Sequence, residues 1–264
     1  MAPSLPTSPA DALSTFGLDG RVVLVTGASS GLGDRFVRVL AGAGATVVAS
    51  ARRLDRLEAL AAEVENVVPV ACDVADDDAC GALVERAEAE GGGQVDVLVN
   101  NAGISDGPTN AEEQDPADFR AVVEVNLNAA FVLSRLCGPA MREAGKGSII
   151  NIASVHGLVA SAPNRQAAYV ASKFGLVGLT KELACQWADQ RVRVNAIAPG
   201  YFASELSSPM LEDEGGLRWV VRNTPMHRAG DPHELDGVLL FLASDASTYV
   251  TGATIPVDGG WTAR

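Results

Sequence analysis

The stretch RVVLVTGASSGLG, residues 21–33, joins a run of apolar residues to a glycine-rich turn and the start of a helical pattern. A continuous Val/Leu run of this kind is typical of a strand buried on both faces of a parallel sheet. The turn has the spacing GxxxGxG, a looser variant of GxGxxG. Its glycines let backbone N–H groups approach a pyrophosphate at the positive end of the following helix. We therefore expect a dinucleotide-binding turn, whose contact residues are Gly27, Ser29, Ser30, Gly31, Leu32 and Gly33.

The rest of the chain repeats this alternation of short apolar runs and longer helical patterns. The expected strands are 21–26, 45–50, 67–72, 95–99, 148–153, 192–197 and 254–257. The expected helices are 32–43, 54–64, 76–90, 116–144 (as one helix or two), 167–187, 206–221 and 232–242. Val/Ile runs between helices indicate parallel strands covered on both faces. The sequence thus predicts an α/β fold, a single Rossmann-type doubly wound parallel sheet with helices on both faces.

The domain organisation follows from the same pattern. No Pro/Gly/Ser-rich linker divides the chain, and no repeat of 20–50 residues is present. We expect a flexible N-terminal tail over 1–17 and a single dinucleotide-binding and catalytic domain over 18–264. The least regular stretch, near 200–230, is the expected substrate lid.

Composition excludes several classes of protein. Of the 264 residues 47% are apolar, and the net charge is −13. No Lys/Arg-rich run offers the basic footprint of a nucleic-acid binder, and no continuous apolar run approaches the roughly 20 residues of a membrane span. The beginning of the chain lacks the features of a signal peptide. The four cysteines form no CxxC pair and lie at no zinc-binding spacing from a histidine, so we expect no metal, reduced thiols and a cytoplasmic location.

Residues at the ends of the next strands are candidates for contacts with the adenosine half of a dinucleotide. An acidic residue after the second strand selects NAD, whereas arginine favours the 2′-phosphate of NADP. Here Arg52 and Arg53 follow that strand, so we expect NADP(H) to be preferred, with Arg52 as the first contact and NAD(H) as the alternative cofactor. Asp73 ends the third strand, where its carboxylate can accept from adenine or cap the next helix. Small residues after the fourth strand let its backbone approach the ligand, at Asn100, Ala102 and Gly103.

A tyrosine and a lysine stand four residues apart, at Tyr169 and Lys173, in an expected helix. A free tyrosine has a pKa near 10 and is a poor acid or base at neutral pH. A cation one helical turn away stabilises tyrosinate and lowers that pKa, which suits acid–base work on a carbonyl or an alcohol. The pair therefore points to proton transfer.

Taken in chain order, these motifs match a known family: TGASSGLG, NNAG, Asn126 within EVNLN, Ser154 within INIAS, Tyr169 with Lys173, and Pro199-Gly200. From about Leu18 to Trp261 the chain resembles the short-chain dehydrogenase/reductases, in particular members similar to 3-oxoacyl-carrier-protein reductase. The resemblance implies hydride transfer between NADP(H) and a ketone or secondary alcohol. It also implies a homotetramer or homodimer.

The resemblance also implies roles for single residues. Tyr169 would be the general acid or base, and Ser154 would hydrogen-bond the substrate oxygen. Lys173 would hold the nicotinamide ribose and lower the pKa of Tyr169, and Asn126 would anchor a water beside Lys173. The implied cofactor contacts further along the chain are Asp73, Val74, Tyr169, Lys173, Pro199, Gly200, Phe202 and Ser204, the last of which replaces the family's usual threonine.

The substrate side departs from the family pattern. The gap from Ser154 to Tyr169 is slightly longer than is common, so the loop between them should bulge beside the substrate. We expect His156, Gln166 and Tyr201 to reach the substrate, which would be a small carbonyl or alcohol compound.

Two other functions remain open from the sequence. The turn also spells GxSxG through Gly27, Ser29 and Gly31, the nucleophile elbow of serine esterases. A noncatalytic protein that binds or senses a dinucleotide could use the same fold. The esterase would leave the Tyr169–Lys173 pair without a role, and the sensor would not need it.

Overall fold

A computed structural model of the chain describes residues 9–205 and 207–264, and its core is a parallel sheet of seven strands in the order β3-β2-β1-β4-β5-β6-β7. The strands are β1 (Val22–Thr26), β2 (Thr46–Ala51), β3 (Val67–Ala71), β4 (Val97–Asn100), β5 (Gly147–Ile152), β6 (Val192–Pro199) and β7 (Thr254–Val257). All six strand pairings are parallel. The expected doubly wound fold is confirmed.

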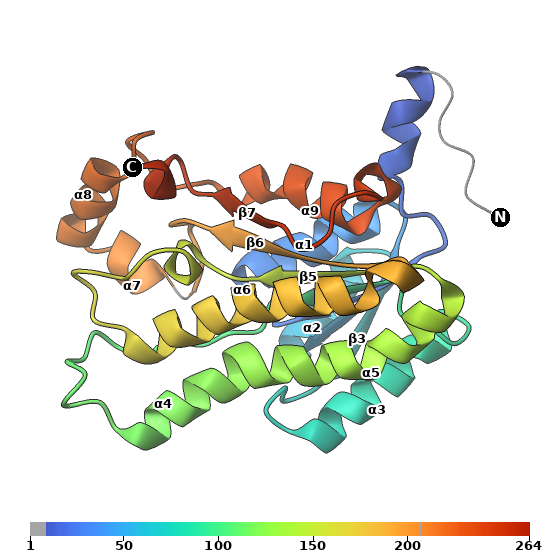
Figure 1. Cartoon of the computed structure of the whole chain (residues 1–264), viewed down its shortest axis with the longest axis horizontal. Coiled ribbons are helices and arrows are strands. Elements are labelled where there is room, and N and C mark those ends of the chain that lie inside the picture. Colours follow the sequence, from blue (N-terminus) through green and yellow to red (C-terminus); the bar gives the residue numbers. More distant parts are fainter. Residues whose placement is uncertain (1–8, 206) are drawn as a thin grey trace.

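Helices cover both faces of this sheet (Figure 1). One layer consists of α1 (Gly31–Gly42), α2 (Leu54–Glu63) and α9 (Asp236–Ala243). The opposite layer consists of α3 (Asp77–Glu90), α5 (Ala129–Ala144) and α6 (Ala167–Trp187). Each layer buries its own apolar cluster, so the sheet has a core on either side.

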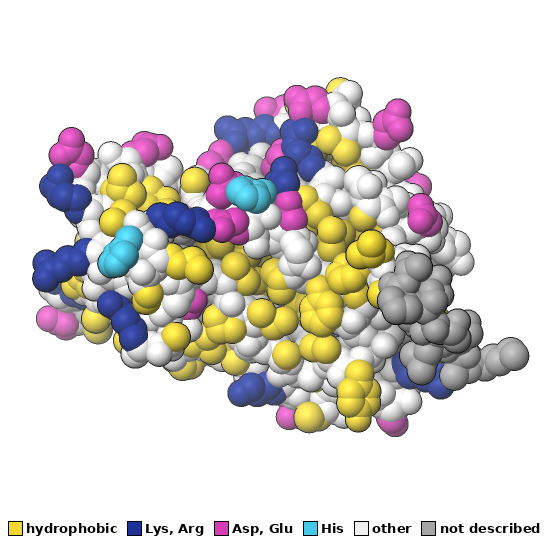
Figure 2. All heavy atoms as spheres, turned by 90° about the horizontal axis from the view of Figure 1, so that it is seen from above, with side chains coloured by type: hydrophobic (Ala, Val, Ile, Leu, Met, Phe, Trp, Pro, Cys, Tyr) yellow, Lys and Arg dark blue, Asp and Glu magenta, His cyan; other side chains and the backbone are white. Residues whose placement is uncertain are grey.

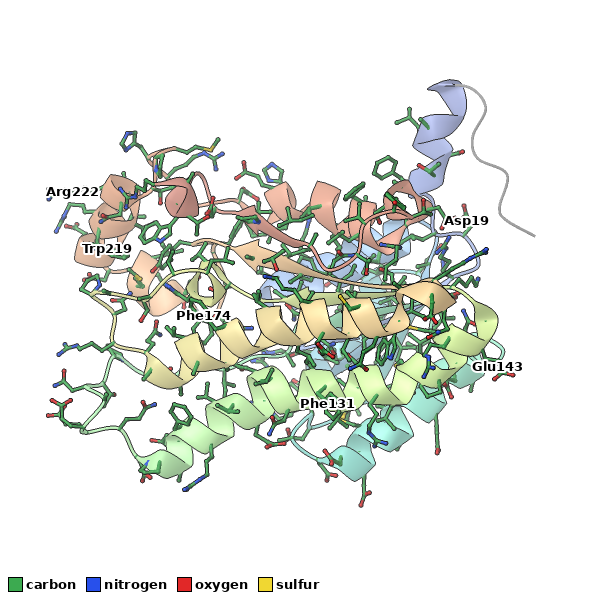
Figure 3. All side chains as sticks on the ribbon, viewed as in Figure 1. Asp19, Phe131, Glu143, Phe174, Trp219 and Arg222 are labelled. Atoms are coloured by element: carbon green, nitrogen blue, oxygen red, sulfur yellow. The ribbon has the colours of Figure 1, made fainter. Side chains whose placement is uncertain are left out.

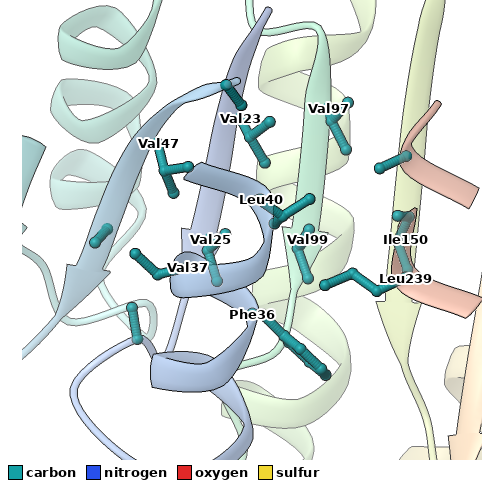
Figure 4. Packing of buried hydrophobic residues seen from close by; sticks show 14 of the residues in the cluster. Val23, Val25, Phe36, Val37, Leu40, Val47, Val97, Val99, Ile150 and Leu239 are labelled. Carbon is teal, nitrogen blue, oxygen red and sulfur yellow. The ribbon is translucent and has the colours of Figure 1, made fainter. Parts of the chain in front are cut away.

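Strand β1 shows why the opening stretch decides the fold. Its residues alternate between the two cores, with Val23 and Val25 on the α1 side and Val22 and Leu24 on the α3 side. Figure 4 shows the first of these cores, where Phe36 of α1 lies against the strands. A strand buried on both faces needs a continuous apolar run, which Val22–Val25 provide before the buried Thr26 ends the strand.

Several boundaries differ from expectation. Residues 9–16 of the expected flexible tail form a 3-10 helix, η1 (Pro9–Phe16), and residues 1–8 lie outside the described part of the chain. The region expected as a helix over 206–221 contains α7 (Ser208–Leu211) and α8 (Glu214–Asn223), because the carboxylate of Asp213 caps α8 by accepting from the backbone N–H of Gly216. The helix expected over 232–242 begins as a 3-10 turn, η5 (Pro232–Leu235), and continues as α9.

Residues 116–144 form a single helical run. A π-helical turn, η2 (Glu124–Asn128), joins α4 (Pro116–Val123) to α5. By length and composition alone the 29-residue run could cross a membrane. It packs against the sheet and α6, and core helices of soluble proteins meet the same criterion, so it does not indicate a membrane span.

The sheet order reverses between β1 and β4, because β2 and β3 lie on one side of this pair and β5, β6 and β7 on the other. In doubly wound folds, ligands bind outside the carboxyl ends of the strands at such a switch point. The turns after β1, β2, β4, β5 and β6 all open at that edge. They carry most of the cofactor contacts expected from the sequence, whereas Asn126, Tyr169 and Lys173 lie on helices and Asp73 and Val74 follow β3.

The turn after β1 is too tight for a side chain at Gly33. A Cβ at Gly33 would lie 2.1 Å from the carbonyl oxygen of Gly27, whereas one at Gly42 of the same helix would meet nothing within 4 Å. We expect Gly33→Ala to lower the free energy of unfolding by about 1–3 kcal/mol. Gly42→Ala should leave it unchanged or raise it by up to about 1 kcal/mol. Chemical denaturation of the two variants makes the comparison, and equal stabilities would show that helix α1 does not depend on this contact.

Candidate active site

The Tyr169–Lys173 pair lies buried in the first two turns of α6, at the carboxyl edge of the sheet. The Lys173 ammonium is 5.6 Å from the centre of the Tyr169 ring. It donates a hydrogen bond of 2.7 Å to the carbonyl oxygen of Ile152, the last residue of β5. Ser154 follows two residues later and is also buried. One strand end thus holds Lys173 in place and carries Ser154.

Burial dominates the electrostatics of the pair. It lowers the pKa of Lys173 to about 8. It raises the pKa of Tyr169 above its ordinary value, an effect opposed by the Ser154 hydroxyl and reinforced by the charge of Asp106. The expected lowering of the Tyr169 pKa by Lys173 is therefore wrong for this structure. The ammonium is directed at the Ile152 carbonyl, and desolvation of both groups outweighs their attraction.

Asn126 lies in the π-helical turn η2 and is buried. Its amide donates to the carbonyl oxygen of Ile104 at 2.9 Å and to Ser172 Oγ at 3.1 Å, while its Oδ1 accepts from the N–H of Ile104 at 2.8 Å. Single π turns inside α-helices occur frequently at functional sites. Here the turn directs a polar side chain from the long helix into the space beside α6.

Gly103 lies between Asn126 and Lys173. A Cβ added at Gly103 would meet Asn126 Oδ1 at 3.3 Å and Lys173 Nζ at 3.7 Å. The backbone of the turn after β4 therefore passes close to both polar groups, as the small residues of that turn led us to expect. Asn100, by contrast, is buried and donates to Asn151 Oδ1 at 2.8 Å, so its side chain serves the sheet.

Asp106 is a site residue that the sequence analysis missed. Its two carboxylate oxygens accept from the backbone N–H groups of Ala168 and Tyr169, at 3.0 and 3.1 Å. Helix α6 has no cap of its own, because its N-cap residue Gln166 bonds instead to Ser105 and to the carbonyl oxygen of Asp106. The lack of Ser, Thr, Asp or Asn at that position is a signal that a cap must come from elsewhere.

The glycine turn has the shape of an anion-binding site. Gly27 has a positive φ of 67°, and a Cβ there would lie 2.8 Å from Ala102 Cα. The amide of Asn101 donates to the carbonyl oxygens of Thr26 and Gly27, which fastens the turn to the end of β4. Helix α1 starts directly after this turn, and the side chain of its N-cap residue, Ser30, makes no capping hydrogen bond. The residues present therefore fit a pyrophosphate at the helix N-terminus.

The adenosine end carries two arginines, but not both of those expected. Arg53 donates to Ser29 Oγ at 3.1 and 3.0 Å and to Ser30 Oγ at 2.9 Å. Arg56, one turn further along, joins the same cluster through Glu205. Arg52 is exposed and forms no hydrogen bond with the described residues, so the structure brings Arg53 rather than Arg52 to the glycine turn.

The ends of β3 and β6 complete the cofactor edge. Asp76, not Asp73, caps α3, and within the described part of the chain the exposed Asp73 carboxylate is bonded only to the N–H of Ala75. Val74 lines a pocket together with Asn100, Ala102 and Asn126. After Pro199, which ends β6, the chain turns at Gly200 beside Asp258, and buried Phe202 pairs with Gly230. Ser204 then lies against Gly31, where a Cβ would meet Ser204 Cβ at 3.3 Å.

On the side where the sequence predicts the substrate, a wall of aromatic side chains is formed by His156, Tyr201, Trp219 and Trp261. His156 Nε2 lies 3.2 Å from the Tyr201 hydroxyl, and its ring is 6.4 Å from that of Tyr169. Tyr201 packs against Trp219 and Trp261, at 5.9 and 5.0 Å between ring centres. Figure 3 places Trp219 on α8, on the side of the molecule where α6 begins. Trp261, close to the end of the chain, was not among the expected residues, and Gln166 bonds to the 105–106 turn instead of reaching this wall.

This wall is polar but uncharged at neutral pH. Burial lowers the pKa of His156 and raises that of Tyr201 to about 12. The wall therefore offers a neutral imidazole and a neutral hydroxyl beside Tyr169, together with apolar ring faces. Such groups suit substrate hydroxyl groups better than a charged headgroup.

Ser29 does not have the surroundings of an esterase nucleophile. Its hydroxyl accepts from Arg53, and no described histidine is among its hydrogen-bond partners. His156 lies instead against Tyr201, on the substrate side. A nucleophilic serine needs an adjacent base, so the geometry does not favour the esterase hypothesis.

Comparisons with known proteins agree with this geometry. Residues 27–262 match the family model described as Enoyl-(Acyl carrier protein) reductase. The chain is 41% identical over 254 residues to galactitol 2-dehydrogenase (L-tagatose-forming) of Cereibacter sphaeroides, covering 96% of this chain and 99% of that one. It is 39% identical to the 3-oxoacyl-acyl-carrier-protein reductase of Thermotoga maritima, covering 92% and 98%. The crystal structure of a gluconate 5-dehydrogenase from Burkholderia cenocepacia with NADP and tartrate matches with a TM-score of 0.89 and 36% identity, over 96% of this chain and 99% of that one.

These matches span nearly the whole chain, and the chain belongs to the short-chain dehydrogenase/reductase family. It is an enzyme that acts on alcohol or ketone groups, as its relatives are named for doing.

The Asp106 carboxylate predicts a change in pH dependence. Asp106→Asn removes a negative charge that raises the pKa of Tyr169, so that pKa should fall. With Tyr169 as the base expected from the sequence, alcohol oxidation requires its deprotonated form, and the rate rises as pH passes through this pKa. The rising limb should therefore move to lower pH in Asp106→Asn.

Asp115→Asn is the matched control, because Asp115 caps the exposed start of α4 by accepting from the N–H of Ala117. The measurement is kcat/KM for oxidation against pH in both variants. If the rising limb of Asp106→Asn stays at the pH of the wild-type limb, as that of Asp115→Asn should, the charge of Asp106 does not act on Tyr169.

Proposed function

We propose that this enzyme transfers a hydride between NADP(H) and a ketone or secondary alcohol, with Tyr169 as its general acid in reduction and general base in oxidation. The observation that supports this most is the meeting of Tyr169, Ser154 and Lys173 at one strand end, beside a glycine turn shaped for a pyrophosphate. The nicotinamide supplies the hydride chemistry when it is bound.

The chain's own residues would divide the remaining work. Ser154 hydrogen-bonds the substrate oxygen, and Tyr169 passes a proton to that oxygen in reduction. Lys173, with a pKa of about 8, is both charged and neutral in useful amounts near neutral pH, so it can pass protons on. Asn126 would then anchor a water that links Lys173 to solvent. Asn126 and Lys173 both border Gly103, and this closeness supports a proton relay between them.

NADP(H) is the proposed cofactor because no carboxylate ends β2 and two arginines reach the site. Arg53 and Arg56 lie beside the glycine turn, where a 2′-phosphate would need them. Solved structures similar to this chain hold NADP, including the Burkholderia gluconate 5-dehydrogenase.

A polyol or a related sugar derivative is the proposed substrate class. Relatives named for galactitol, threitol and deoxygluconate derivatives support it, as does the uncharged wall of His156 and Tyr201. The buried Lys173 also speaks against the noncatalytic dinucleotide sensor that the sequence left open, because burying an ammonium group is costly and a sensor has no need of one.

We also propose a homotetramer or a homodimer in the cytoplasm. Phe119, Phe131 and Phe174 are exposed on α4, α5 and α6, and Figure 3 places the last two on one side of the molecule. Figure 2 shows a further apolar patch on the face that carries α9. The cysteines are all free, in keeping with a reducing compartment. A monomeric mass by light scattering would exclude the assembly, and recovery in an extracytoplasmic fraction would exclude the location.

Tyr169→Phe should abolish turnover while it leaves NADPH binding intact, because only the reacting hydroxyl is removed. Loss of kcat by about 100-fold or more is expected for a general acid. Tyr249→Phe is the matched control, since Tyr249 is fully exposed and should leave kcat unchanged. Turnover across a panel of polyols and ketones, with binding followed by NADPH fluorescence, provides both measurements. Activity retained in Tyr169→Phe would contradict the role.

Cofactor preference is a separate prediction. The catalytic efficiency with NADPH should exceed that with NADH, because Arg53 and Arg56 can receive a 2′-phosphate. Arg53→Gln should reduce the efficiency with NADPH more than that with NADH. Exposed Arg52→Gln serves as the matched comparison, and a larger effect at Arg52 would restore the assignment made from sequence. An efficiency with NADH at or above that with NADPH would contradict the preference.

A further inference from the structure

Glu205 brings a negative charge onto the arginine cluster of the cofactor edge. It lies in the segment after β6 and accepts hydrogen bonds from Ser30 Oγ at 2.8 Å and from Arg53 at 2.9 and 3.4 Å. Arg56 binds the other side of the same carboxylate, at 2.5 Å. One carboxylate therefore engages two guanidinium groups and the hydroxyl group that precedes α1.

The Glu205 carboxylate lies where a phosphate group of a ligand could bind. The groups around it favour an anion, and they are accessible from solvent. The N-terminus of α1 and a pair of arginines are the groups that favour an anion. The three charged side chains are 42%, 47% and 53% exposed, so a ligand can reach them from solvent. The ion pairs hold the pKa of Glu205 at about 2, so the carboxylate is charged throughout the working pH range.

We propose that Glu205 is a specificity-determining residue, whose carboxylate competes with a 2′-phosphate for Arg53 and Arg56 and so limits the preference for NADP(H) over NAD(H). The inference rests on the proposed function, because it assumes that this edge binds the adenosine end of the cofactor.

Two effects act in the same direction. A ligand with a 2′-phosphate must separate Glu205 from Arg53 or bind beside its negative charge, and either cost weakens NADP(H). A ligand with a free 2′-hydroxyl leaves the ion pairs intact and can donate a hydrogen bond to the carboxylate. Acidic residues favour NAD in this way at the end of the second strand. Here the acidic residue comes from the segment after β6, 152 residues beyond Arg53.

Glu205→Gln tests the proposal, since it keeps the shape and removes the charge. Adenosine 2′,5′-bisphosphate and AMP are the probes for calorimetry, because they differ by the 2′-phosphate alone and need no turnover. Affinity for the bisphosphate should rise roughly five- to thirtyfold, as expected for the release of two half-exposed ion pairs. Affinity for AMP should stay unchanged or fall. NADPH and NADH, followed by fluorescence, should show the same divergence.

Glu212→Gln is the matched control. Glu212 lies on the same segment, is exposed and forms no side-chain hydrogen bond or ion pair with the described residues, so this variant should bind all four ligands as the wild type does. Thermal unfolding of both variants shows that they are folded.

The outcomes separate this inference from the proposed function. An unchanged ratio of bisphosphate to AMP affinity in Glu205→Gln, with wild-type NADPH binding intact, would overturn the inference alone. The same result in Glu212→Gln as in Glu205→Gln would also overturn it, because the effect would then be one of net charge. A wild-type protein that binds neither NADPH nor NADH would overturn both proposals.

Discussion

The close contact between the turn after β1 and the end of β4 is the constraint on which the site depends. Gly33 approaches the Gly27 carbonyl so closely that a side chain at Gly33 would clash with it. The amide of Asn101 donates to the carbonyl oxygens of Thr26 and Gly27, where β1 ends. This contact aims the N-terminus of α1 at the sheet edge. It also fixes the turn after β4, whose Gly103 borders Asn126 and Lys173. The glycine turn and the Tyr169–Lys173 end of the site are thus joined through the turn after β4.

Burial costs at Lys173 and at the start of α6 are offset by specific hydrogen-bond partners. An ammonium group inside a protein is unfavourable unless it has hydrogen-bond acceptors, and Lys173 has the Ile152 carbonyl. Helix α6 begins with free N–H groups that require a cap, and Asp106 provides it from another loop. The same carboxylate then lies close enough to raise the pKa of Tyr169. Structural support and electrostatic tuning are therefore performed by the same atoms.

The fold was largely predictable because its signals are local. Val/Ile runs mark strands buried on both faces, and the Tyr169–Lys173 spacing lies within one helical turn. The residues that were missed act over long separations in sequence. Asp106 caps a helix about 60 residues away, and Glu205 meets an arginine 152 residues away. Nothing near Glu205 in the sequence reveals that partner. The direction of the Tyr169 pKa shift was also wrong, since burial depends on the packed structure.

The charge balance of the molecule explains why a single carboxylate can matter at the cofactor edge. A protein of net charge −13 repels a cofactor that is itself an anion, so binding requires a local positive region. Here that region is small and consists of the α1 N-terminus with Arg53 and Arg56. Two guanidinium charges paired with one carboxylate leave a net charge of about +1 at the point of contact, and at physiological ionic strength charges beyond roughly 8 Å are largely screened. The net charge of the arginine cluster, rather than the total charge of the protein, therefore governs discrimination between a ribose hydroxyl and a ribose phosphate.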